Sequence, residues 1–90
     1  MADQHWNDAI AASLAQESGV LLSARHWEVI RIYRELYLSH HRHPITRVFV
    51  KALHAESSTA SMLELMQLFG ERPLATISFI AGLPKPPHCV

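Results

Sequence analysis

The 90-residue chain has a single cysteine, Cys89, and this scarcity excludes several kinds of site. One thiol cannot form an internal disulfide, a four-cysteine zinc site or a cysteine-ligated cluster. Apolar runs are short as well, and none approaches the ~20 residues that a membrane-spanning helix needs. The first seven residues are polar, without a basic start and an apolar core, so we expect no signal peptide. These features predict a cytoplasmic protein, in a reducing compartment where the thiol stays available.

The chain also lacks net charge, because eight Lys and Arg balance eight Asp and Glu. Proteins that bind nucleic acid mainly through their net positive charge are strongly basic, so the equal numbers of cationic and anionic residues argue against that class. The cations nevertheless gather in residues 23–51, which hold six of them against two Glu. This segment is either an ordinary solvated helix face or a mildly basic patch for an acidic partner or RNA.

Apolar residues recur at helical spacing almost throughout, and no segment alternates convincingly enough for a strand. A first helix is expected between a cap at Asp3 and a stop at Gly19. A second begins at the cap Ser23 and frays near residues 40–43, because Pro44 disfavours helical geometry just before it. The expected inward face of the first helix carries Trp6, Ile10 and Leu14. The expected solvent-exposed face of the second helix carries Glu28, Arg31, Arg34 and Glu35.

Three shorter helices complete the pattern. Pro44 suits the first turn of a third helix, whose apolar stripe is Ile45, Val48, Phe49, Ala52 and Leu53. A fourth helix follows a capping-box spacing, Ser61 and Glu64, and ends at Gly70. Pro73 opens a last short helix over 74–80, which Gly82 closes. The sequence therefore predicts an all-α fold, a small orthogonal bundle of four main helices plus a short fifth.

The tail after Gly82 has a different composition. Three of the four residues 84–87 are proline, which fixes φ and removes backbone donors, so the tail is neither helix nor central strand. A polyproline-like arm of eight residues is roughly 25 Å long. We expect a helical domain over residues 1–82 and a flexible C-terminal arm over 83–90 that carries the cysteine.

Cys89 is the candidate functional residue. Structural cysteines are usually buried, and a cysteine next to the end of a proline-rich tail has little to be buried against. The arrangement suits a thiol that is handed into other proteins' active sites and carries a persulfide or a mixed disulfide. The alternative is a frayed tail that ends in an incidental cysteine. A protonated His88 favours the thiolate, whereas the terminal carboxylate of Val90 opposes it.

Other residues of the chain could form a metal site or a nucleic-acid-binding site, but each also has an ordinary structural explanation. Neutral imidazoles bind zinc or nickel, but adjacent histidines at a helix end point in different directions, which favours a solvated helix terminus at His40, His41 and His43.

The third and fourth helices also outline a helix-turn-helix, and the alternative function is therefore that of a nucleic-acid-binding protein. The would-be reading helix carries no Lys or Arg to meet phosphate or guanine, which argues against specific DNA binding. Lys85 either guides an acidic partner onto the arm or solvates it.

Several blocks of the chain resemble one known family, the TusE/DsrC family of sulfur-trafficking proteins. The resemblance runs from Trp6 to Val90. It rests on residues 26–30, Arg34, Tyr37, residues 44–47, 51–53 and 68–69, and above all on the run from Ile80 to Pro86 followed by Cys89 and Val90.

The resemblance implies a small helical fold with a mobile arm whose penultimate cysteine, here Cys89, carries sulfur. Members that serve dissimilatory sulfite reductase have a second cysteine eleven residues earlier, where this chain has Ser78. A hydroxyl forms no disulfide, so the chain resembles the single-cysteine relay type. Such a carrier accepts persulfide sulfur from a sulfurtransferase complex and passes it to an acceptor enzyme, for tRNA thiolation or sulfur oxidation. We expect protein partners, no direct nucleic acid contact, no membrane, no cofactor and no metal; whether the carrier counts as an enzyme is left open.

Overall fold

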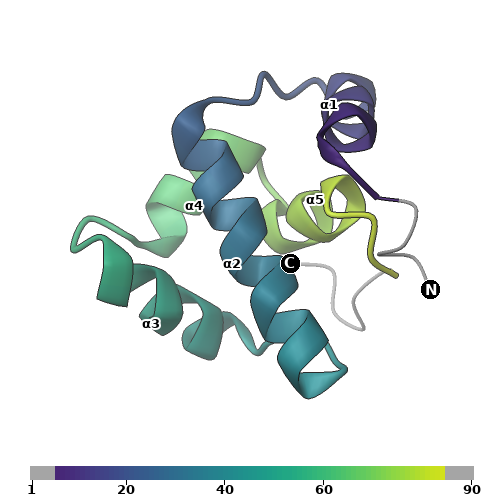
Figure 1. The fold of residues 1–90 in the computed structure, drawn as a ribbon. Helices are drawn as coiled ribbons and strands as arrows, with labels where there is room; N and C mark the ends of the chain where they lie inside the picture. The colour runs from purple at the N-terminus through teal and green to yellow at the C-terminus, as the bar shows by residue number, and fades with distance from the viewer. Residues whose placement is uncertain (1–5, 85–90) are drawn as a thin grey trace.

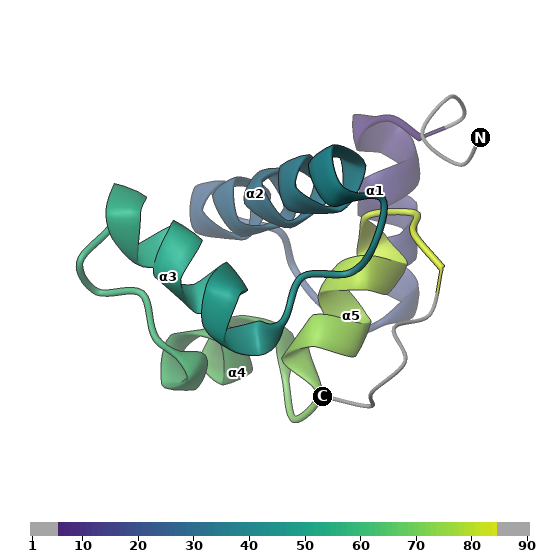
Figure 2. The same ribbon diagram turned by 90° about the horizontal axis from the view of Figure 1, so that it is seen from below.

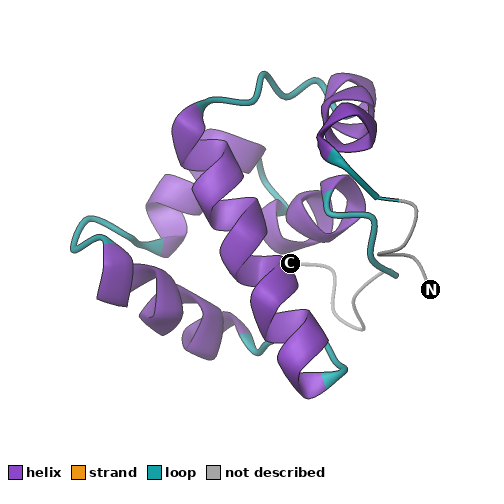
Figure 3. Cartoon of the chain, in the orientation of Figure 1, coloured by secondary structure: helices purple, strands orange, loops and turns teal. Residues whose placement is uncertain are grey.

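The computed structural model describes residues 6–84, and within that range the chain forms five α-helices and no strand (Figures 1 and 3). The helices are α1 (Asp8–Glu17), α2 (Ala24–His40), α3 (Thr46–Glu56), α4 (Met62–Phe69) and α5 (Pro73–Ile80). The all-helical prediction is confirmed. The division into four main helices and a short fifth is not confirmed, because α4 and α5 each have eight residues. None of the helices described is long and apolar enough to cross a membrane.

Three of the other helices are arranged around α5. It packs against α1, α2 and α4, and Figure 2 shows α1 at one side of α5, α4 at the other and α2 across them. The reason lies in its composition, because Pro73–Ile80 has no charged residue and a helix that is apolar all round is stable only when buried. Pro73 stands at the first helical position, as predicted, where its missing N–H costs nothing.

The core lies where α5 meets α2, α3 and α4. Its largest side chains are fully buried and come from all four of these helices: Val29, Ile30, Tyr33, Phe49, Leu53, Leu65, Ile77 and Ile80. The ring of Tyr33 meets that of Phe49 edge to face, with centroids 5.0 Å apart, which joins α2 to α3.

The predicted start of the first helix is wrong. α1 begins at Asp8, because Asn7 adopts an extended conformation and its side-chain oxygen accepts the backbone N–H of Ile10 at 2.9 Å. Trp6 therefore precedes the helix, and Asp3 lies outside the described residues. The small Ala11 and Ala15 form the buried face instead, which lets the α1 backbone approach α5 closely.

The predicted apolar stripe of the third helix is only half right. Phe49 and Leu53 are buried, but Ile45 is 69% and Val48 45% exposed. The helix begins at Thr46 with Ile45 as its extended N-cap, so Pro44 lies before it rather than in its first turn. α3 packs mainly on α2, and a helix with one neighbour buries a narrower face than a stripe of five apolar positions.

The first turn of α2 is tied to the end of α4 through a buried histidine. Both the N–H and the hydroxyl of Ser23 lie close to Nδ1 of His26, at 3.1 and 2.7 Å. On the other side of the ring, Nε2–H donates to the carbonyl of Leu68 at 2.8 Å. His26 is 7% exposed and its ring meets Phe69 edge to face, so it is a structural residue.

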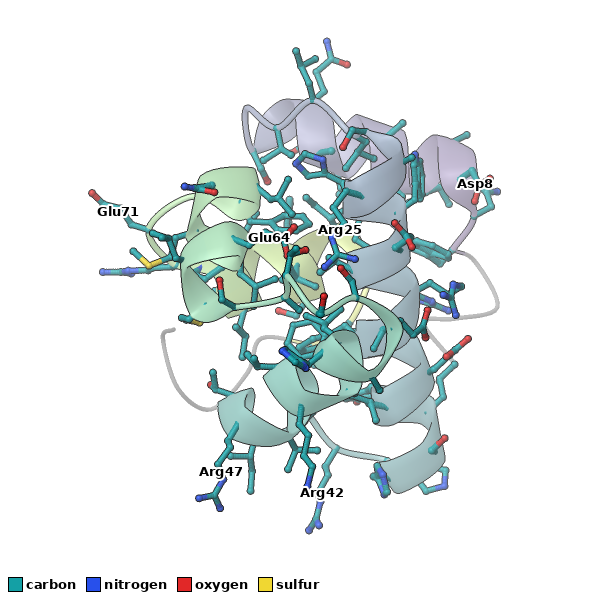
Figure 4. The ribbon with its side chains drawn as sticks, turned by 90° about the vertical axis from the view of Figure 1, so that its left-hand side faces the viewer. Asp8, Arg25, Arg42, Arg47, Glu64 and Glu71 are labelled. Carbon is teal, nitrogen blue, oxygen red and sulfur yellow. The ribbon has the colours of Figure 1, made fainter. Side chains whose placement is uncertain are left out.

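An ion pair makes a second tie between the same helices. Arg25 donates two hydrogen bonds to the carboxylate of Glu64, at 2.8 and 3.0 Å, and Figure 4 shows the two side chains pointing toward each other. This hydrogen-bonded carboxylate raises the pKa of Arg25. The predicted cap is confirmed, because the Glu64 N–H donates to the Ser61 hydroxyl at 3.2 Å. The Glu64 carboxylate accepts the hydrogen bonds of Arg25.

Candidate functional site: the base of the C-terminal arm

Cys89 lies outside the described residues, so the geometry on view is that of the arm base, residues 80–84, from which the chain leaves the body. The end of α5 is a Schellman turn. The Gly82 N–H donates to the carbonyl of Phe79 at 3.1 Å, and the Leu83 N–H donates to the carbonyl of Ser78 at 3.0 Å. Gly82 has φ +72°, as this turn requires. Two hydrogen bonds therefore fix the direction in which the chain leaves α5.

Two side chains from distant parts of the chain hold the last carbonyls of α5. Nε1–H of Trp6 donates to the carbonyl of Ile80 at 2.8 Å, and the guanidinium of Arg34 donates to the carbonyl of Ala81. The Arg34 guanidinium also lies 4.0 Å from the centroid of the Trp6 ring, a cation–π distance. The terminal carbonyls of a helix lack intrahelical partners and carry partial negative charge, so an N–H donor and a cation both stabilise them.

Gly82 is needed at the arm base for a second reason besides its positive φ. A β-carbon placed there would lie 2.5 Å from Cδ1 of Trp6, well inside van der Waals contact. Glycine thus lets the indole lie flat against the turn while its N–H reaches Ile80. The predicted role of Gly82 as a helix stop is correct, and the packing of Trp6 adds to it.

His43 supports the arm base from the loop between α2 and α3. The hydroxyl of Tyr33 lies 2.7 Å from its Nδ1, and Tyr37 meets the ring edge to face at 4.9 Å. Nε2 is buried and has no partner of normal hydrogen-bond geometry among residues 6–84. Burial lowers the pKa of His43, and the backbone of Pro84, close to the ring, opposes that shift in part. Burial also raises the pKa of Tyr33 to about 12.

Ser78, the position where the resemblance implies a second cysteine in some members, faces the protein interior. Its side chain is 1% exposed, and its hydroxyl donates to the carbonyl of Ala75 one turn earlier at 3.0 Å. The hydroxyl is therefore used inside α5 and presents no group to the surface.

The structure separates the other predicted site residues. His43 turns inward to Tyr33, whereas His40 and His41 are exposed at the end of α2. No group of three or more metal-ligating side chains gathers anywhere in the part of the chain that the structure describes. The helix α4, which would read DNA in this interpretation, exposes Leu63, Met66 and Gln67 and no Lys or Arg. The helix-turn-helix interpretation is not favoured.

Sequence reasoning missed the residues that hold the arm base. Periodicity predicts Trp6 on a helix face and Arg34 on the solvent side of α2, whereas both side chains bind carbonyls at the end of α5. The Ala-Gly-Leu-Pro run after an apolar helix does predict the turn at residues 81–84. It does not predict the donors, because Trp6 and Ile80 are 74 positions apart in the chain.

Comparisons with known proteins agree on one family. The family described as DsrC like protein matches residues 1–90. The sulfurtransferase TusE of Salmonella typhimurium is 39% identical over 87 residues, which cover 94% of this chain and 80% of that protein.

Solved structures give the same result for the fold. The solution structure of DsrC from Allochromatium vinosum superposes with a TM-score of 0.83 at 30% identity, covering 97% of this chain and 80% of that one. The crystal structure of DsrC from Archaeoglobus fulgidus, the oxidised γ-subunit of its dissimilatory sulfite reductase, gives 0.84 at 30% identity, with 97% and 82% covered.

Proposed function

Since the chain belongs to the DsrC-like family of sulfur-relay proteins, we propose that it accepts persulfide sulfur on Cys89 from a partner sulfurtransferase and passes it to an acceptor enzyme. The proposal rests on the position of the only thiol of the chain. Cys89 follows within a few residues the arm base, which side chains from other segments of the chain hold in place. The reducing cytoplasm, where a free thiol persists, is the compartment that this chemistry needs.

A fixed base makes the reach of the thiol predictable. Trp6 and Arg34 bind the last carbonyls of α5, and His43 packs beside Pro84. Cys89 follows Pro84 by five residues, and a polyproline segment rises ~3.1 Å per residue, so its reach is about 15 Å. That length lets the thiol enter a recessed donor site while the helical body stays outside.

Sulfur transfer needs no oxidant or reductant. The Cys89 thiolate attacks the outer sulfur of the donor's persulfide, the donor's S–S bond breaks, and the donor cysteine leaves as a thiolate with the electron pair. A persulfide is a stronger acid than a thiol, so the loaded Cys89 is ready for the next transfer. The acceptor's thiolate repeats the attack, and Cys89 is released unchanged.

Ser78 supports assignment to the single-cysteine relay type, because a hydroxyl cannot take part in an internal trisulfide. In some members of this type the sulfur serves tRNA thiolation. Its hydroxyl is buried and bonded within α5, so it gives Cys89 no second reacting group. Sulfur oxidation is the other destination, and identification of the acceptor decides between them.

The test is to incubate the protein with a persulfidated sulfurtransferase of its host and to weigh it intact. We expect a gain of one sulfur atom that dithiothreitol removes. Cys89→Ser is the matched control and should unfold at the same urea concentration as the wild type while gaining no sulfur. The proposal fails if the wild type gains no sulfur from any sulfurtransferase of its host or from glutathione persulfide.

A further inference from the structure

Positive charge is left unpaired on one side of the molecule. The ion pairs among residues 6–84 join Arg25 to Glu64 and Glu28, and Arg31 to Glu35 and Glu56. Arg34 is used at the arm base. The remaining cations near α3 have no carboxylate within 4.0 Å in the described part of the chain: Arg42, Arg47 and Lys51.

These cations share one exposed surface. Arg47, Lys51 and His54 follow one another at i, i+4 and i+7, so they line one face of α3, away from the buried Phe49 and Leu53. Arg42 precedes the helix in the α2–α3 loop, and Figure 4 shows Arg42 and Arg47 projecting from the same end of the molecule. The chain has no net charge, so this cationic face is a local concentration rather than a general basicity.

The cationic face borders a groove with an apolar floor. The groove has a volume of about 650 Å³ and lies between α3 and the start of α4. Val50, Ala55 and Met62 form its apolar part, Arg47 and Lys51 form its cationic part, and His54 lies beside them. We call these six residues the α3 groove.

We propose that the α3 groove is the docking site for an acidic segment of a partner protein. Carboxylates of the partner would face Arg47 and Lys51 while an apolar side chain enters between Val50 and Met62. RNA fits less well, because the groove offers no aromatic ring on which a base could stack. Docking through this groove would supply encounter rate and orientation, which are the usual contributions of complementary charge.

The α2–α3 loop links the N-terminal end of α3 to the arm base. His43 packs beside Pro84 at the arm base, and Arg42 and Arg47 flank His43 in the chain. Figure 2 shows α3 and the end of α5 at opposite sides of the molecule, so a partner held on the α3 groove would extend past this loop to meet the arm. The identification of this partner as a relay protein rests on the proposed function, whereas docking of an acidic segment does not.

The direct test uses an acidic helical peptide with Glu at i, i+4 and one Leu, titrated into ¹⁵N-labelled protein at low salt. We expect amide shifts confined to the α3 groove and affinity that falls as salt rises. Arg47→Glu with Lys51→Glu should weaken binding about tenfold, a change of ~1.4 kcal/mol. Both changes suit the helix, because Glu at the first turn of α3 is favourable and Glu in its middle is as helix-prone as Lys.

The matched control is Arg72→Glu, which reverses an exposed charge at the start of α5, outside the groove. Equal weakening by this variant, or shifts outside the groove, would overturn the proposal. Tighter, groove-dependent binding of a single-stranded RNA would replace it with a nucleic-acid site.

A second experiment separates this proposal from the proposed function. Sulfur loading from a protein donor should slow about tenfold in the α3 variant, while loading from glutathione persulfide stays unchanged. Unchanged loading from every protein donor and unchanged transfer to the acceptor would remove the α3 groove from the relay. Absence of loading from both donor types would instead refute the carrier function and leave the peptide titration to decide the docking site.

Discussion

At the scale of single residues, the arm base depends on side chains that act on backbone carbonyls. Trp6 and Arg34 each donate to one carbonyl at the end of α5, and each also contacts the other through the cation–π pair. Gly82 leaves the space in which the indole lies. Substitution of one of these residues therefore changes the support of the arm as well as the stability of the fold.

Replacement of Gly82 by alanine tests that support. An alanine at φ +72° is strained, and its β-carbon would displace Trp6 from the turn, so we expect a loss of about 2–3 kcal/mol in the free energy of unfolding. Urea denaturation measures the loss, and tryptophan fluorescence reports the displaced indole. Gly19→Ala is the matched control, because Gly19 has φ +75° but nothing within 4 Å of a β-carbon. An equal loss in the two variants would remove the role of Trp6.

The pH dependence of stability tests the burial of His43. Burial lowers its folded-state pKa, so the unfolded chain takes up a proton there at a higher pH than the folded chain. The contribution of His43 to stability is therefore complete above its unfolded pKa of about 6.5 and is lost as the pH falls below that value. Urea unfolding at pH 7.5 and 5.5 should show a smaller difference for His43→Gln than for the wild type. His54→Gln, on the exposed face of α3, should keep the wild-type difference.

At the scale of elements, short helices are stable here because other elements complete their ends. α4 and α5 have eight residues each, below the length at which an isolated helix persists in water. Ser61 caps the start of α4, His26 holds the carbonyl of Leu68 near its end, and Trp6 and Arg34 hold the end of α5. The bundle thus depends on polar contacts between helices as well as on its apolar core.

The Arg25–Glu64 pair measures how firmly α4 is tied to α2. Glu64→Gln keeps the side-chain shape but removes the charge from a two-bonded pair whose side chains are 19% and 23% exposed. We expect a loss of about 1 kcal/mol, toward the upper end of what surface pairs contribute. Glu35→Gln, at a pair with Arg31 whose side chains are half exposed, should cost less than Glu64→Gln, because solvent screens that pair. Equal costs in urea denaturation would show that the α2–α4 pair is an ordinary surface pair.

At the scale of the whole molecule, the five-helix body contains no cysteine, and the single thiol of the chain follows it near the C-terminus. Cys89 is the only cysteine, and Ser78 is buried within α5. The protein is therefore expected to react with sulfur between molecules and not within one. This separates it from two-cysteine relatives, in which an internal disulfide is possible.

Mild oxidation tests the intermolecular character of this chemistry. Wild-type protein treated with diamide and glutathione should give monomers with one glutathione adduct, or dimers linked through Cys89, as read by intact mass. Cys89→Ser should give neither product. A sulfur-containing crosslink within one chain would contradict the expectation.

The sequence by itself determined the local features of this protein. The caps at Ser23 and Ser61, the start of α5 at Pro73 and the turn at Gly82 follow from propensities within a few residues. The all-helical class follows from periodicity, and the resemblance that led to the family follows from the motif near the end of the chain. The predicted limit of the helical domain at residue 82 and the role of Cys89 stay predictions, because residues 85–90 lie outside the described structure.

Only the tertiary structure decided which residues meet at the arm base. Trp6, Arg34 and His43 all lie far along the chain from the end of α5, and their meeting depends on how the segment before α1, α2 and the α2–α3 loop pack around it. The predicted wet face of α2 failed at Arg34 for the same reason. Helical periodicity tells which face of a helix is apolar. It does not identify Arg34, a polar residue that is half-buried in the fold because its guanidinium lies over an indole and donates to a carbonyl.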